Sequence, residues 1–196
     1  MSKIINPFRI SIYTNYVNES YFNSIKSEVL LFIKKNKDSL IKSPNWIGDT
    51  LTNIDSCKSK TINTPLLSKV IKTEVENYIK TSNSFNPLIK NLSLEDLWVN
   101  VAKPNQYQET HDHTGSLISG TLYIDVNNQS GSFQFLNPLN SEFALQGLKG
   151  GINYVHNINP SNGMILLFPS WMQHRVLPNK STKDRISISF NIISKF

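Results

Sequence analysis

The sequence predicts an α+β protein in which helices precede a β-rich unit with the form of a sandwich or barrel. In the first ninety residues, apolar side chains recur every three or four positions, which is the period of an amphipathic helix. From about residue 97, short apolar runs alternate with clusters of Asn, Pro, Gly and Ser, as is typical of strands joined by turns. Helices that precede such a unit are expected to cover one of its sheets.

Two helices are expected in the N-terminal part of the chain. The first is expected over residues 19–37, and it ends before Pro44. Its apolar face consists of Phe22, Ile25, Val29, Phe32 and Ile33. The second begins at Thr64 and Pro65, because threonine caps helices and proline is favoured in the first turn. Its apolar face consists of Leu67, Val70, Ile71, Val75, Tyr78 and Ile79.

Strands are expected over residues 98–102, 106–113, 118–126, 132–136, 153–158, 164–169 and 185–193. The last strand is the clearest, because its alternate side chains form two different faces. The apolar face consists of Ile186, Ile188, Phe190 and Ile192. The polar face consists of Arg185, Ser187, Ser189 and Asn191. If the apolar face packs beneath the helices, the polar face lines a cavity, where Arg185 and Ser187 can bind a carboxylate.

Three of the four histidines form a candidate metal site. His111 and His113 lie two positions apart, so in an extended strand their side chains share a face while that of Asp112 points away. His174 can supply a third ligand from a distant segment. Imidazoles gathered in this way suit a first-row transition metal such as Fe(II), Zn(II) or Ni(II). His156 has no ligand-like neighbour and is expected to be an ordinary surface or packing histidine.

Length and composition fit one globular domain over residues 1–196. The chain is 39% hydrophobic and 17% charged, and it is long enough to bury a core. We expect a helical part over residues 1–92 and a β-rich core with the metal site over residues 93–196. The net charge of +6 arises from residues 1–90, where 13 Lys and Arg face 7 Asp and Glu. These lysines are interspersed with acids and lack arginine and aromatic platforms, so no nucleic-acid partner is predicted.

The sequence predicts a cytoplasmic protein without a membrane partner. No apolar run approaches the roughly 18 residues that a spanning helix needs. The first residues show no secretory signal pattern. Cys57 is the only cysteine, which excludes an intramolecular disulfide and fits a reducing compartment. No evident base adjoins Cys57, so we do not expect this thiol to be catalytic.

Residues 98–193 resemble the iron(II)/2-oxoglutarate-dependent oxygenases, and most of all a group of uncharacterised 2OG-Fe(II) oxygenases from bacteria and cyanophages. The first motif of the resemblance is residues 111–123 (HDHTGSLISGTLY), with histidines at alternate positions before Ser-Gly and Tyr. The second motif comprises residues 168–176 (FPSWMQHRV) and 185–191 (RISISFN). The resemblance implies a double-stranded β-helix, or jelly-roll, core with Fe(II) and 2-oxoglutarate as cofactors. A viral source would place the protein in the host cytoplasm.

The resemblance also implies roles for particular residues. His174 would be the distal metal ligand, Arg185 would bind the remote carboxylate of 2-oxoglutarate, and Ser187 would assist. Tyr123 would be a further donor to that carboxylate. The 11-residue spacing of His174 and Arg185 is compatible with two adjacent strands joined by a turn. Phe168 and Trp171 are candidate walls of the site, although aromatic residues at such positions more often belong to the core.

The first motif departs from the usual pattern, because members of the superfamily mostly present His-x-Asp or His-x-Glu. Strand position places His113 where the carboxylate would lie. Four alternatives follow. In the first, His111, His113 and His174 form a three-histidine site. In the second, Asp112 reaches the metal through a local bulge; in the third, Glu109 joins His111 on the same strand face; in the fourth, there is no functional metal. A third neutral imidazole would leave the centre more positive than a carboxylate does.

The resemblance implies a dioxygenase that converts 2-oxoglutarate and O2 to succinate and carbon dioxide while it hydroxylates a substrate. One alternative is a cupin-like three-histidine metalloprotein that does not use 2-oxoglutarate and has no need of Arg185. Another is a non-catalytic binding module that contains no metal. Neither the substrate nor the oligomeric state follows from the sequence. Selectivity would lie in loops such as residues 137–151, which can form either a lid or a plain connection.

Overall fold

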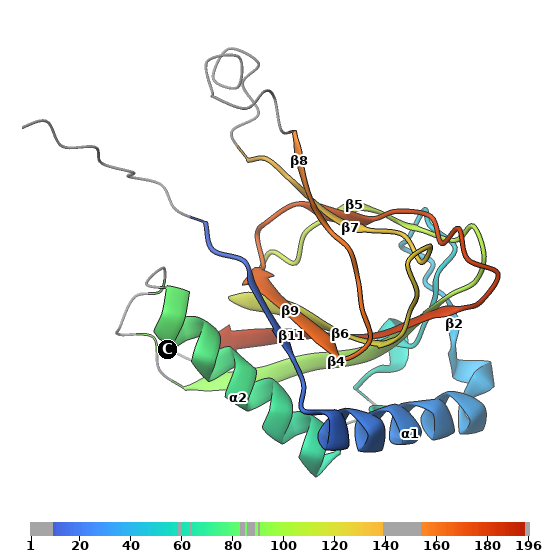
Figure 1. Cartoon of the computed structure of the whole chain (residues 1–196), viewed down its shortest axis with the longest axis horizontal. Helices are drawn as coiled ribbons and strands as arrows, with labels where there is room; N and C mark the ends of the chain where they lie inside the picture. Colours follow the sequence, from blue (N-terminus) through green and yellow to red (C-terminus); the bar gives the residue numbers. More distant parts are fainter. Residues whose placement is uncertain are drawn as a thin grey trace, which may run out of the picture.

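A computed structural model describes residues 10–58, 60–62, 64–82, 85, 89, 91–138 and 154–194 of the chain. Two antiparallel sheets face each other, and two helices cover the outer side of the larger sheet (Figure 1). The predicted α+β class, with helices on one sheet, is therefore confirmed. Most of the loop expected over residues 137–151 lies outside the described residues.

The larger sheet holds seven strands and the smaller sheet holds four. In spatial order the larger sheet consists of β1 (Tyr13–Tyr16), β9 (Met164–Pro169), β6 (Ile118–Asp125), β11 (Arg185–Ser194), β4 (Leu92–Ala102), β3 (Leu51–Thr52) and β2 (Ile41–Lys42). The smaller sheet consists of β5 (Gln108–His111), β10 (His174–Val176), β7 (Phe133–Leu136) and β8 (Val155–Ile158).

Both predicted helices are present, and each begins at a capping residue. Helix α1 (Glu19–Lys35) starts after Asn18, whose side chain accepts a hydrogen bond from the Ser20 amide at 3.0 Å. Helix α2 (Pro65–Ser82) starts after Thr64, whose hydroxyl accepts from the Leu67 amide at 3.3 Å. Two short 3-10 turns, η1 (Lys37–Ser39) and η2 (Ile54–Ser56), complete the helical elements. No helix in the described part of the chain is long and apolar enough to cross a membrane.

The helices and the larger sheet enclose the main hydrophobic core. The inner faces of α1 and α2 bury Ile25, Val29, Leu67, Val70, Ile71, Val75 and Tyr78. The apolar face of β11 packs in the same core, through Ile186, Ile188, Phe190 and Ile192. The opposite, polar face of β11 points between the two sheets, where Arg185, Ser187 and Ser189 line a cavity. The prediction that these residues face a cavity is confirmed.

The N-terminal part also supplies three strands that the sequence did not predict. Strand β1 pairs with β9 along four residues, and β3 pairs with the central strand β4. Three of the four residues of β1 are exposed, so β1 lacks the alternation that marks a half-buried strand. Strands β2 and β3 have two residues each, which is too short for any periodicity. Pairing with the rest of the sheet, and not local sequence, therefore decides their conformation.

Strands β10 and β11 correct the expectation of two adjacent strands joined by a turn. They follow each other in the chain, but β10 pairs with β5 and β7 while β11 pairs with β4 and β6. The connection over residues 177–184 therefore crosses from the smaller sheet to the larger one. As a result, His174 and Arg185 lie on opposite walls of the cavity.

Candidate metal centre and adjoining cavity

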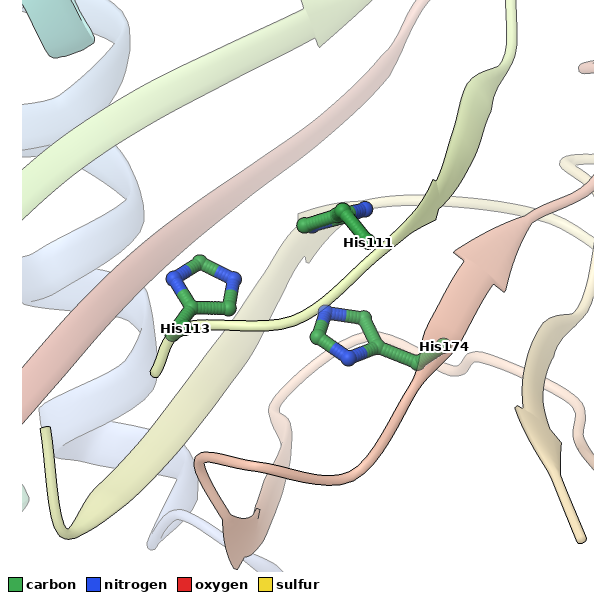
Figure 2. A group of neighbouring side chains, drawn as sticks. All are labelled: His111, His113 and His174. Carbon is green, nitrogen blue, oxygen red and sulfur yellow. The ribbon is translucent and has the colours of Figure 1, made fainter. Parts of the chain in front are cut away.

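His111, His113 and His174 converge between the two sheets (Figure 2). His111 ends β5 and His174 begins β10, and these residues are direct partners in the antiparallel pair of the two strands. His113 lies two residues beyond β5, in a loop whose position is fixed by a hydrogen bond from the His113 amide to the Ser170 carbonyl at 2.9 Å. One ring nitrogen from each histidine lies within 4.8 Å of the other two. Three ligand atoms therefore surround one point.

Backbone carbonyls orient two of the imidazole rings. Nδ1 of His111 lies 2.8 Å from the Glu109 carbonyl oxygen, and Nδ1 of His174 lies 2.8 Å from that of Met172. A carbonyl oxygen only accepts hydrogen bonds, so each Nδ1 carries the proton and each Nε2 keeps a free lone pair. The ring of His113 stacks parallel to that of His174, with centroids 5.3 Å apart. A metal-binding histidine typically has a backbone partner at one ring nitrogen, which fixes its tautomer and leaves the other nitrogen for the metal. His111 and His174 both have this arrangement.

Burial keeps the three imidazoles neutral. Loss of solvent lowers the pKa of His111, and it lowers that of His113 to about 4, with a further contribution from His111. The pKa of His174 lies well below its usual value for the same reasons. Neutral imidazole is the form that coordinates a metal. The donor set therefore fits a transition metal such as Fe(II) without prior loss of a proton.

The two carboxylates considered as alternative ligands have other partners. The exposed Asp112 accepts hydrogen bonds from the amide and hydroxyl of Thr114 at 2.9 and 2.6 Å, and these bonds lower its pKa. The carboxylate of Glu109 accepts from the backbone amides of Ile47 and Gly48, each at 2.9 Å. Neither belongs to the described group of side chains that can share one metal ion.

The remaining histidine and the cysteine lie elsewhere. His156 is exposed on β8, as expected for an ordinary histidine. Cys57 is buried beside η2, and burial raises the pKa of its thiol, with a further contribution from the nearby Asp96. A protonated, buried thiol is a poor nucleophile.

Arg185, Tyr123 and Ser187 share the cavity with the histidines. The buried guanidinium of Arg185 donates through Nη1 to the carbonyls of Ser130 and Leu177, at 2.7 and 3.0 Å. No carboxylate in the described part of the chain pairs with this cation. Burial lowers the pKa of Arg185 to about 10, so the side chain remains charged at neutral pH. The cavity therefore offers a buried positive charge to an acidic ligand.

Gly131 allows the carbonyls of Ser130 and Leu177, which bind Arg185, to lie close together. Its φ of +82° suits glycine, and a Cβ there would collide with the Leu177 carbonyl oxygen. The turn that carries Ser130 can therefore pack directly against Leu177. The sequence shows only a glycine at a turn, so the binding of the Arg185 guanidinium by these two carbonyls could not be predicted from the sequence.

Three buried polar atoms that have no hydrogen-bond partner among the residues the structure describes also line the cavity. They are Trp98 Nε1, Asn100 Oδ1 and Tyr123 OH. Asn100, Ser187 and Tyr123 are direct partners across β4, β11 and β6, so they form one polar row on the inner face of the larger sheet. Unpaired buried polar groups are costly, which indicates that a polar ligand completes this row. Trp98 and Asn100 are not among the site residues predicted from the sequence, although their alternation in β4 was a usable signal.

Aromatic side chains close the cavity behind His174. The ring of Phe168 meets that of His174 edge to face at 4.8 Å, and Phe133 stacks on His174 at 5.0 Å. Phe168 therefore lines the cavity and also belongs to the smaller hydrophobic cluster, so it combines the two roles that the sequence left open. Trp171 is half exposed and does not line this cavity. Trp171 lies outside the cavity because it belongs to the turn between β9 and β10.

Comparison with known proteins decides the family. Residues 96–191 match the sequence profile of a family described as "Putative 2OG-Fe(II) oxygenase". This match places residues 96–191 in the 2OG-Fe(II) oxygenase family. The matched region begins in β4 and ends in β11, so it contains all three histidines and Arg185. No curated protein sequence matches the chain.

Solved structures confirm the double-stranded β-helix fold of this 2OG-Fe(II) oxygenase. A prolyl-4-hydroxylase from Pseudomonas putida superposes with a TM-score of 0.65 at 11% identity, over 95% of this chain and 94% of that one. A Trichoplax adhaerens prolyl hydroxylase, in complex with a hypoxia inducible factor peptide fragment, gives 0.64 at 16% identity over 94% and 83%. HygX from Streptomyces hygroscopicus, with nickel, 2-oxoglutarate and hygromycin B bound, gives 0.62 at 12% identity over 95% and 84%.

Proposed function

We propose that this protein is an Fe(II)- and 2-oxoglutarate-dependent hydroxylase whose metal ligands are His111, His113 and His174. The observation that carries the proposal is the presence, within one cavity, of three neutral imidazoles and a buried arginine that has no carboxylate partner among the described residues. Fe(II) and 2-oxoglutarate are the metal and cosubstrate of the family. Three neutral imidazoles can bind Fe(II), and the buried guanidinium can bind a carboxylate of 2-oxoglutarate.

Each histidine would present Nε2 to the metal, because Nδ1 of His111 and His174 is engaged by a carbonyl. Three neutral ligands from one side leave other coordination positions for the cosubstrate and O2. Fe(II) with bound 2-oxoglutarate supplies the oxidation of a substrate C–H bond by O2, with release of succinate and carbon dioxide. The buried walls of the cavity, including Phe133 and Phe168, exclude water from the reacting atoms.

Arg185 would bind the carboxylate of 2-oxoglutarate that is remote from the metal. Two carbonyls fix the guanidinium through Nη1, which leaves its other N–H groups for a carboxylate. Tyr123 OH has no hydrogen-bond partner within the described part of the chain, and burial raises its pKa, so it remains a hydrogen-bond donor. Ser187 lies beside Tyr123 in the polar row and would be the third donor. These groups orient the cosubstrate between the arginine and the metal.

A second function is favoured by one observation, the absence of a carboxylate from the described metal-site residues. Three histidines without a carboxylate are also compatible with a cupin-like metalloprotein that acts on a small molecule without 2-oxoglutarate. Such a protein would have no use for Arg185, whose burial is costly. The solitary arginine therefore favours the oxygenase.

We do not assign a primary substrate. The structurally similar proteins include prolyl hydroxylases and HygX in complex with hygromycin B, and these act in different chemical contexts. We place the protein in the cytoplasm, which the single cysteine supports, and in the host cytoplasm if the source is a virus.

The proposal is tested by anaerobic reconstitution with Fe(II), followed by exposure to O2 and 2-oxoglutarate. We expect a single bound iron per chain by elemental analysis and slow formation of succinate without added substrate. His174→Ala should lose both, while His156→Ala, the matched exposed histidine, should retain both. Bound iron without succinate in any condition would favour the cupin-like protein. Absence of bound iron would favour a non-catalytic binding module.

A further inference from the structure

Residues 43–50 bridge the open edge between the two sheets. They connect β2 and β3, which end the larger sheet, and they contact β5, which ends the smaller sheet. Two short strands at a sheet edge cannot hold such a connection by their own pairing, because they contribute two residue pairs. Lys42 of β2 donates to the Ile47 carbonyl at 3.3 Å and to the Asp49 carboxylate at 3.0 Å, and further hydrogen bonds that position residues 43–50 run to Tyr107 and β5.

Glu109 is the main attachment of this segment to β5. Its carboxylate accepts a hydrogen bond through each oxygen, from the amides of Ile47 and Gly48, both at 2.9 Å. Gln108 donates a further bond through Nε2 at 3.0 Å, which orients the carboxylate. A carboxylate that accepts two backbone amides makes stronger hydrogen bonds than a neutral acceptor. Glu109, which the sequence left as an alternative metal ligand, thus holds the segment instead.

Two further contacts fix the segment closely against Tyr107, the residue that precedes β5. The Thr50 hydroxyl donates to the Tyr107 carbonyl at 3.0 Å. Gly48 is buried, and a Cβ at this position would collide with the same Tyr107 carbonyl oxygen. Any larger residue at position 48 would therefore push the segment away from the strand.

Trp46 is the residue through which this segment reaches the cavity. It lines the cavity with His111 and His113, and Thr50 lines it on the same side. The neighbouring Ile47 is 75% exposed, so the segment has solvent on one side and the cavity on the other. We propose that Trp46 forms the wall past which ligands reach the metal, and that Glu109 is the positioning residue that holds this wall closed.

This inference rests on the proposed function, because the ligand that passes Trp46 is 2-oxoglutarate. If Glu109 holds the wall, its loss raises the rates of 2-oxoglutarate binding and release together and leaves the affinity almost unchanged. Loss of a charge-assisted attachment of this kind shifts a closed-to-open ratio by about tenfold or more. Loss of a metal ligand would instead weaken the affinity for iron and for 2-oxoglutarate.

The experiment compares Glu109→Ala with the wild type and with Glu95→Ala, an exposed strand glutamate remote from the cavity. Hydrogen exchange should show the amides of residues 47 and 48 exchanging about tenfold faster in Glu109→Ala and at the wild-type rate in Glu95→Ala. Stopped-flow measurement of 2-oxoglutarate binding to the anaerobic Fe(II) protein should show both rate constants raised by a similar factor. Gly48→Ala keeps Glu109 and should give the same pattern, which covers the case in which Glu109→Ala does not fold.

Three results would overturn the inference. Unchanged exchange at residues 47 and 48 would show that Glu109 does not hold the segment. Faster exchange with unchanged rate constants would show that ligands do not pass Trp46. A large loss of iron affinity in Glu109→Ala would make Glu109 a ligand. If the wild type bound no 2-oxoglutarate, the proposed function and the passage of this ligand would both fail, while the exchange data would still decide the attachment.

Discussion

His113 determines the electrostatics of the proposed metal site at the residue scale. The resemblance places it where the superfamily usually presents a carboxylate, and an imidazole brings no negative charge. Iron(II) held by three neutral imidazoles keeps its full charge, and Arg185 adds another within the same cavity. The two carboxylates of 2-oxoglutarate would offset most of this charge. The three-histidine site is therefore expected to depend on the cosubstrate for its charge balance more than a site with a carboxylate ligand.

Replacement of single side chains around the site distinguishes the possible ligand sets. His113→Ala should weaken Fe(II) binding by more than the roughly 10–100-fold that loss of an outer-shell partner costs. Asp112→Asn should leave it almost unchanged, because Asp112 is exposed and bonded to Thr114. Anaerobic metal titration measures both. The opposite pattern, with Asp112→Asn more damaging than His113→Ala, would show that the aspartate is the ligand.

Acid should destabilise the metal-free protein in a defined pH range. Burial lowers the pKa of His113 to about 4, while in the unfolded chain it is about 6.5. Between these values the unfolded state binds more protons than the folded state. The free energy of unfolding should therefore fall as pH decreases from about 6.5 to about 4, by up to about 1.4 kcal/mol per pH unit for one histidine.

Chemical denaturation across this range measures the effect, and His113→Phe should reduce the slope. A free energy of unfolding that stayed constant or rose between pH 6.5 and pH 4 would contradict the burial of neutral imidazoles.

At the scale of elements, the connection from β10 to β11 determines the geometry of the cavity. It separates His174 and Arg185 onto opposite sheets, and the buried Asn179 fixes its course. The Asn179 amide donates to the carbonyls of Ala102 and Lys183, at 2.9 and 2.8 Å. One side chain thus joins the end of β4 to the approach to β11.

Asn179→Ala should destabilise the fold, because it removes the donor to the buried Ala102 carbonyl and to the carbonyl of the exposed Lys183. A buried carbonyl left unsatisfied costs about 1–3 kcal/mol. Asn128→Ala, at an exposed turn, should have little effect. Thermal and urea unfolding of the two variants test this difference, and equal stabilities would show that Asn179 does not determine the course of the connection.

The sequence predicted elements well where periodicity was strong and poorly where pairing decided the structure. The apolar faces of both helices and the two faces of β11 follow directly from their spacing, and the structure confirms them. Strands β1, β2 and β3 have little or no pattern of their own. The crossing between β10 and β11 could not be predicted from an 11-residue spacing, because the same length can join neighbours within one sheet.

At the scale of the whole molecule, the two layers have different tasks. The helices and the larger sheet form the core that supports the polar row, and the smaller sheet brings two of the histidines to it. The histidines and Arg185 could be identified from the sequence because few residue types bind metals or carboxylates. Trp46 and the role of Glu109 could not, since they depend on contacts between residues far apart in the chain.

The most direct test of the whole account is a titration of the anaerobic Fe(II) protein with 2-oxoglutarate, followed by its visible metal-to-ligand charge-transfer band. We predict that the band appears in the wild type, requires much more 2-oxoglutarate in Arg185→Ala, and is unaffected by Arg175→Ala, which removes an arginine outside the cavity. An iron-loaded wild type that gave no band would contradict the assignment of this cavity to 2-oxoglutarate.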